Sequence, residues 1–204
     1  MFMSPVLKLV GIGVLAATLV VAVGGLFMPS KYAVEREIVI QASPERIHQF
    51  TNDLKTWPEW TPWFKNDPTL EITLGPVTEG EGASQQWKAK KGGGQLEITR
   101  SDPQWGIQYN MDLSKGRPDS INSMRYEPMA DSTKVIMKME GDRGWNLMGR
   151  YVNLLMDPMV GPMFDDGLLR LKVLAEKPDD EQQDAEQQDA GQSGAGQSEA
   201  DTAS

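Results

Sequence analysis

The sequence predicts an α+β domain in which an antiparallel sheet is covered by one long C-terminal helix, with a single transmembrane helix in front of it. Three observations predict this fold: an uncharged apolar run near the N-terminus, a series of short alternating stretches through the middle, and a wide apolar stripe at helical spacing farther on. The chain has 204 residues. Once its two unusual ends are set aside, the middle fits one domain with a single core.

The N-terminal apolar run extends from Leu9 to Met28 without a charge. About 20 residues at ~1.5 Å each cross a ~30 Å hydrocarbon layer. A cleaved signal peptide, with Lys8 as its positive region, is the alternative. The run is longer than an ordinary signal-peptide core, so we expect residues 1–30 to be a retained membrane anchor.

The charged residues on the two sides of this anchor indicate opposite orientations in the membrane. Lys8 favours a cytoplasmic N-terminus, whereas Lys31 and Arg36 just after the run favour the opposite. A short signal-like N-terminal region usually stays in the cytoplasm. We therefore expect a single-pass membrane protein whose soluble domain, residues 31–177, is periplasmic or otherwise extracytoplasmic.

The domain begins with a strand followed by a short helix. Residues 34–41 alternate with a period of two, as a strand does. Ser43 then supplies a helix cap, followed by a proline at the first helical position, so we expect a helix from Pro44 to about Thr51. Two prolines next interrupt a cluster of three tryptophans, Trp57, Trp60 and Trp63.

Six further strand-like stretches follow, each bounded by turn residues. They are residues 69–74, 83–90, 95–101, 105–113, 120–127 and 134–140. Their spacing implies consecutive antiparallel hairpins. In the clearest stretch, 105–113, apolar and polar residues alternate, so one face must be covered.

The cover is the segment from Trp145 to Lys177, which carries a wide apolar stripe. Pro158, Gly161 and Pro162 should bend this helix near residues 157–163, because each proline removes a backbone donor. The chain then ends in residues 178–204, an acidic, repetitive segment without aromatic or branched aliphatic residues, which we expect to be disordered.

The acidic tail accounts for most of the net charge of −9. Of the 29 acidic residues, eight lie in the tail, and the remaining 21 nearly match the 20 basic residues. The folded part therefore lacks the basic surface that nucleic-acid binding requires. The chain has no cysteine, which excludes disulfides, a thiol nucleophile and the usual cysteine zinc site.

The order of elements resembles the helix-grip fold of the START-like, SRPBCC superfamily, within its polyketide cyclase/dehydrase-like branch. The resemblance spans Val34 to Lys177 and is carried by four segments: residues 40–45, 57–63, 80–83 leading to Trp87, and 167–172. It implies a curved sheet wrapped around the long helix, with an apolar cavity used across the superfamily for lipids, sterols, polyketides and similar ligands. It transfers no catalytic residue to this sequence.

No group of residues in the sequence indicates catalysis, a cofactor or a metal site. The single histidine, His48, has no neighbouring carboxylate in the sequence to orient it, so we expect a surface or boundary position. Asp165 and Asp166 point about 100° apart on a helix and fit a solvated face or a cap. Gly92 to Gly94 fit a flexible hairpin turn rather than a phosphate cradle.

The candidate ligand-binding residues are aromatic and methionine side chains on the expected inner surface, where flexible thioethers suit an adaptable pocket or simply fill gaps in the core. These candidates are Trp60, Trp87, Tyr109, Met111, Met137, Met139, Met148, Met156 and Met163.

Three functions remain open. The first is a membrane-anchored, non-catalytic binding module for a lipid or another hydrophobic small molecule, which needs a sizeable apolar cavity without converging ionisable groups. The second is a cyclase- or dehydratase-type enzyme, for which Asp112, Tyr109 or Arg125 would be the first suspects. The third is a scaffold with a collapsed cavity, whose acidic tail recruits a partner.

Overall fold

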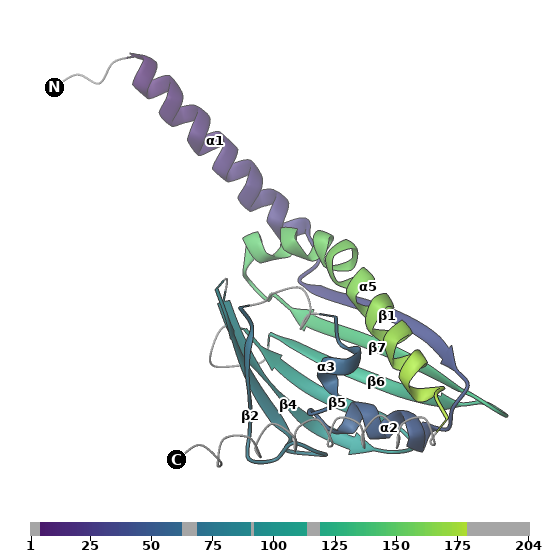
Figure 1. Ribbon diagram of the computed structural model, residues 1–204. Coiled ribbons are helices and arrows are strands. Elements are labelled where there is room, and N and C mark those ends of the chain that lie inside the picture. The colour runs from purple at the N-terminus through teal and green to yellow at the C-terminus, as the bar shows by residue number, and fades with distance from the viewer. Residues whose placement is uncertain (1–4, 63–68, 91, 114–118, 179–204) are drawn as a thin grey trace, which may run out of the picture.

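A computed structural model describes residues 5–62, 69–90, 92–113 and 119–178. It shows one sheet, one long helix lying against it, two short helices and an N-terminal helix that projects away from the rest (Figure 1). The elements are α1 (Pro5–Phe27), β1 (Lys31–Ile40), α2 (Pro44–Asn52), α3 (Trp57–Trp60), β2 (Glu71–Leu74), β3 (Ser84–Ala89), β4 (Gly92–Asp102), β5 (Gly106–Asp112), β6 (Ser120–Pro128), β7 (Thr133–Asp142) and α5 (Leu147–Ala175).

The sheet confirms the predicted series of hairpins. Its seven strands are all antiparallel and follow the order β1-β7-β6-β5-β4-β3-β2. Neighbouring strands are consecutive in the chain, except that β1 lies at the edge of the sheet beside β7. A bulge between Ile98 and Arg100 interrupts the pairing of β4 with β5, and such an extra residue bends a strand.

Helix α5 covers the concave face of the sheet, as the apolar stripe predicts (Figure 1). Its second half buries Phe164, Leu168, Leu171 and Ala175 in the core, and their spacing of four, three and four residues keeps them on one helix face. The helix runs across the end of α1 in its first turns and then turns along the sheet (Figure 1). Two internal prolines lie along it.

The tryptophan segment forms a short helix of its own, α3, instead of a mere break in the chain. Trp57 and Trp60 are fully buried, and their indole N–H groups donate to the backbone carbonyls of Thr51 and Phe50, both at 3.0 Å. A buried indole needs such a partner. The two rings are therefore fixed core side chains, whereas Trp63 lies outside the described residues.

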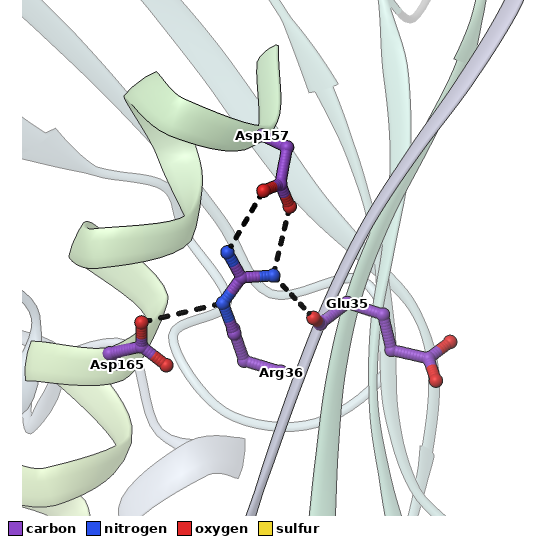
Figure 2. Close-up of polar contacts among 4 residues, drawn as sticks. All are labelled: Glu35, Arg36, Asp157 and Asp165. Carbon is purple, nitrogen blue, oxygen red and sulfur yellow. Dashed lines mark hydrogen bonds and ion pairs between the residues drawn. The ribbon is translucent and has the colours of Figure 1, made fainter.

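One charged side chain, Arg36, points from β1 towards α5 (Figure 2). Its guanidinium donates to both carboxylate oxygens of Asp157, at 2.9 and 3.2 Å, and to Asp165 at 3.3 Å. A side chain at Gly161 would overlap this guanidinium. The glycine thus lets Arg36 lie between α5 and the sheet, and the carboxylates hold it in a forked geometry.

Helix α1 is long and apolar enough over Leu9–Phe27 to cross a membrane, by its length and composition. Most of its large side chains are exposed. Of the expected disordered tail, 178–204, all residues after Pro178 lie outside the described part of the chain.

Candidate ligand-binding cavity

Between the sheet and the middle of α5 lies a cavity of about 520 Å³ that is partly open to solvent. Strands β2 to β5 and β7 supply its wall and α5 its cover. Its main lining residues are Ile72, Gln85, Trp87, Leu96, Tyr109, Met111, Met139, Val160, Met163 and Phe164. Nearly all are apolar or aromatic, which is typical of pockets for small hydrophobic molecules.

Alternation in β3 places three side chains towards the cavity. Gln85, Trp87 and Ala89 line it, whereas Gln86 and Lys88 are exposed between them. Trp87 lies opposite Gly94 on β4, where a side chain would overlap the indole ring. Gly92 to Gly94 are paired with β3 as part of β4, so the expectation that they form the hairpin turn is wrong. Gly94 in particular makes space for the largest side chain of the cavity wall.

Two buried amide oxygens, one of Gln85 in the cavity wall and one of Asn122 beside it, lack hydrogen-bond partners. Gln85 is only 3% exposed, and its Oε1 has no hydrogen-bond partner. Asn122 on β6 lies in register between Tyr109 and Met139, which both line the cavity, and its Oδ1 is also buried without a partner. A buried acceptor without a donor lowers the stability of the folded state by about 1–3 kcal/mol. Gln85 is therefore a lining residue with an unused acceptor, and Asn122 lies beside the lining residues without being one of them.

Among the described residues that line the cavity, Tyr109 is the one with an ionisable side chain. It is 1% exposed, and its ring packs edge-on against Trp57 with 5.2 Å between the ring centroids. Burial raises the pKa of its phenol well above the ordinary value, because no water solvates the phenolate. The hydroxyl therefore stays protonated at neutral pH and offers a hydrogen bond rather than a general base.

The other two residues suspected for an enzyme face away from the cavity. Asp112 follows the lining residue Met111 on β5, so it points to the opposite, convex side of the sheet. Arg125 is half-exposed, with its guanidinium 3.6 Å from the carboxylate of Glu127. Among the residues that the structure describes, no group of three His, Asp or Glu is arranged to hold a metal ion.

His48 is buried, with 7% of its surface exposed, and not at the surface or boundary as its sequence neighbours suggest. Its Nε2 lies 3.1 Å from the hydroxyl of Ser101, and its Nδ1 lies 3.5 Å from that of Tyr126. The Tyr126 hydroxyl in turn lies 2.5 Å from that of Thr51. Burial lowers the pKa of His48, with Asp102 and Glu79 opposing the change. This network joins α2 to the sheet outside the cavity lining.

The structure brings five of the nine predicted ligand-binding residues to the cavity: Trp87, Tyr109, Met111, Met139 and Met163. The other four lie elsewhere. Trp60 and Met137 are buried in the packed core. Met156 packs against that core, and Met148 is 67% exposed on the outer side of α5.

Gln85, Leu96, Val160 and Phe164 line the cavity but were not among the sequence-based candidates. The alternation of β3 around Trp87 contains the signal for Gln85, since residues two apart on a strand share a face. Phe164 and Val160 need knowledge of which side of α5 meets the sheet. That side is not marked in the sequence, because both sides of the helix carry apolar residues.

Comparison with known proteins agrees with this geometry. The family model described as polyketide cyclase / dehydrase and lipid transport matches residues 31–176. No curated protein matches the chain. Among solved structures, the KanY protein is 13% identical with a TM-score of 0.54 and coverage of 72% of this chain and 99% of its own.

Protein MLL2253 from Mesorhizobium loti is 18% identical, with a TM-score of 0.50 and coverage of 72% of this chain and 98% of its own. At these identities the similarity concerns the fold alone. The expected helix-grip fold is confirmed.

Proposed function

The chain belongs to the polyketide cyclase / dehydrase and lipid transport family, and from this premise we propose that its domain binds a lipid or another apolar small molecule without transforming it. The observation that carries the proposal is the cavity between α5 and the sheet. Its volume of about 520 Å³ lies within the range of about 300–1,000 Å³ for small-molecule sites. A collapsed interior, which a pure scaffold would favour, is not what these residues form.

The ligand we infer is an apolar body with one polar group. The lining side chains would bury the body, at ~25 cal/mol for each Å² of apolar surface removed from water. The amide of Gln85 would bind the polar group, because its buried Oε1 has no partner among the described residues. An alcohol, an amide or a protonated acid supplies the donor that this oxygen needs.

The absence of a suitable proton carrier among the described lining residues favours binding over catalysis. General acid–base catalysis works best with a pKa near the working pH, whereas burial moves the pKa of Tyr109 away from it. A cyclase or dehydratase remains the second candidate, with the Tyr109 hydroxyl as a hydrogen-bond donor to a substrate carbonyl. That reading requires turnover that is lost in Tyr109→Phe while ligand binding persists.

We propose that residues 1–30 anchor the domain, residues 31–177, to a membrane as a single-pass protein, with the domain on the extracytoplasmic side. Support comes from the length and composition of α1 and from its exposure, since its large side chains have no covering protein partner over most of the helix. Residues 178–204 would form a solvated acidic tail.

Native mass spectrometry of the full chain tests the binding function. The protein is extracted from membranes in a mild detergent, and the complex is dissociated in the instrument to release any small molecule. We expect one apolar molecule per chain that survives detergent exchange. Ala89→Trp, which fills the cavity from β3, should release it, while Gln86→Trp on the opposite, exposed face of the same strand should retain it.

Two results would contradict the proposal. One is an empty chain that binds no displaceable fluorescent fatty acid. The other is a ligand retained equally by both tryptophan variants, because that ligand would then lie outside the cavity.

A further inference from the structure

The first turns of α5 are attached to the end of α1. The guanidinium of Arg150 donates to the backbone carbonyls of Gly25, Leu26 and Met28, at 3.3, 3.4 and 3.3 Å. The last carbonyls of a helix lack partners within the helix and carry partial negative charge, so a cation is favourable there. The Tyr151 hydroxyl donates to the carbonyl of Val21 at 2.8 Å. This attachment fixes the depth of α5 relative to α1.

The attachment begins within the candidate span and continues to Met28, just after its end. The span ends at Phe27, and Val21 lies six residues earlier, which is about 9 Å along a helix axis. A side chain at Gly25 would meet Leu147 at 3.0 Å, so the two helices approach closely there. If α1 crosses a membrane, Leu147 and Tyr151 therefore lie at the level where hydrocarbon gives way to headgroups.

The same segment of α5 presents an apolar stripe that the described residues leave uncovered. Met148, Val152, Leu155 and Met159 follow each other by four, three and four residues, which places them on one side of the helix. Their exposed fractions are 67, 43, 55 and 61%. Trp145, just before the helix, is 85% exposed. Exposed apolar side chains gathered in this way mark a contact surface.

Charge is nearly absent from this part of the chain. From residue 145 to residue 156 the one charged side chain is Arg150, and its donors bind the backbone at the end of α1 and the carbonyl of Gly144. Asp157, the next charge, is held by Arg36. Tryptophan and tyrosine at this level fit the interfacial layer, where amphipathic rings are enriched.

We propose that residues 145–159, the first half of α5 with Trp145, lie in the interfacial layer of the same bilayer that α1 crosses. The proposal rests on the membrane anchor of the proposed function. A lipid surface is favoured over a protein partner because the stripe continues from the α1–α5 contact at the depth where lipid begins. A helix in this position buries its apolar side about 5–10 Å into the boundary between headgroups and acyl chains.

The cavity lies at the same end of the sheet. Strand pairing places Lys31, where β1 begins, beside Asp142, where β7 ends. The same end of the sheet is formed by Ser120 at the start of β6, Met111 near the end of β5 and the start of β4. The lining residues Ala89, Gly92 and Met111 lie along that edge. Val160 and Met163 follow the stripe directly on α5. An apolar ligand could thus pass between the bilayer and the cavity over a short, apolar path.

Site-directed spin labelling tests the proposal, and the cysteine-free chain is suited to it. Leu155→Cys and Leu169→Cys make a matched pair, because the two leucines are on the same helix with exposed fractions of 55 and 54%. They are 14 positions apart, about 21 Å along the helix. Val14→Cys in α1 reports whether that helix is in the bilayer. Each full-length variant is nitroxide-labelled and placed in vesicles of phosphatidylcholine with about one fifth of phosphatidylglycerol, an anionic lipid.

We expect collisions with oxygen to exceed collisions with a water-soluble nickel complex at position 155, as in lipid, and the reverse at position 169. Four results would overturn the proposal: water-like accessibility at both positions, lipid-like accessibility at both, reversal of the pattern, or protection of position 155 from both reagents, as a protein partner would cause. A water-like label at position 14 would show that the anchor itself is wrong. Binding of a fluorescent fatty acid in the same vesicles reports separately on the cavity.

Discussion

The two ends of the layer between α5 and the sheet differ in how closely their side chains pack. At the end covered by α2 and α3, Trp57, Trp60 and Leu168 are almost completely buried in the core. At the end nearer α1, a cavity of about 520 Å³ separates α5 from β3, β4 and β5. A packed end can hold the fold while a hollow end accepts a ligand, so stability and binding depend on different residues of one core.

Two methionines on β7 show the difference most directly. Met137 and Met139 are two residues apart on one strand and face the same side of the sheet. Met137 is 1% exposed and lies in register with Met124, which is also fully buried. Met139 is only partly buried and lines the cavity. The boundary between the packed end and the hollow end thus passes between neighbouring positions of one strand face.

The largest expected effect is loss of stability at the packed end. Met137→Ala should lower the free energy of unfolding by about 2–5 kcal/mol, because it opens a new cavity among close-packed side chains. Met139→Ala should cost about 1 kcal/mol or less, since part of that side chain already faces empty space. Urea unfolding of both variants in the same detergent measures the difference. Equal losses would show that the two ends are packed alike.

The next largest effect is expected when one alanine at the packed end and one at the hollow end are each replaced by leucine. Ala83, fully buried just before β3, should tolerate leucine poorly, with a loss of about 1–3 kcal/mol from overpacking. Ala89 lines the cavity, so Ala89→Leu should leave stability within about 1 kcal/mol of the parent and instead weaken binding of a fluorescent fatty acid by about tenfold, or ~1.4 kcal/mol. Unchanged probe affinity in Ala89→Leu would place the ligand elsewhere.

A third effect concerns the polar group in the hollow end. Gln85→Leu removes a buried acceptor without a partner, so the empty protein should become more stable by roughly 1 kcal/mol. A long-chain alcohol should lose affinity by a few-fold to about tenfold, while the corresponding hydrocarbon should not. Isothermal titration with the two ligands separates these outcomes. Equal losses for both ligands would point to a change in shape and not in hydrogen bonding.

The smallest effect is a pH dependence at the packed end. Burial lowers the pKa of His48 below its ordinary value of 6.5, so the unfolded chain takes up a proton more readily than the folded one. The contribution of neutral His48 to the stability of the folded state is therefore fully present above pH 6.5. It is lost as the pH falls from there towards the pKa of His48 in the folded protein. The denaturant midpoint of the parent should fall as the pH is lowered from about 8 to about 5. The midpoint of His48→Gln should change less over the same range. Parallel profiles would exclude His48 as the cause.

Much of this fold could be predicted from local patterns. Strand-like stretches bounded by turn residues predict seven strands, each of which overlaps a strand of the sheet. The serine and proline at the start of α2 predict that helix, where Ser43 accepts a hydrogen bond from the Arg46 amide at 3.2 Å. The closing helix followed from its length and its apolar stripe. These signals are short-range, because period and capping depend on residues within a few positions of each other.

The cavity could be predicted only in part, for a physical reason. Alternation indicates that Met137 and Met139 face the same way, but whether each meets a neighbour depends on where α5, α2 and α3 lie. On α5 the apolar residues occupy more than one side, so Met148 and Met163 look equivalent in sequence although one is exposed and the other lines the cavity. The partners of His48, Ser101 and Tyr126, are 53 and 78 positions away.

The most direct test of the central claim uses the methionines as reporters. The chain contains 12 methionines, and ¹³C-methyl labelling of the full-length protein in detergent gives each a resolved NMR signal, assigned by Met→Leu variants. Titration with oleyl alcohol should shift the methyl signals of Met111, Met139 and Met163 at the hollow end and leave those of Met124 and Met137 in place. Saturable binding that leaves the first three signals unmoved, or moves those of the packed end instead, would contradict the account.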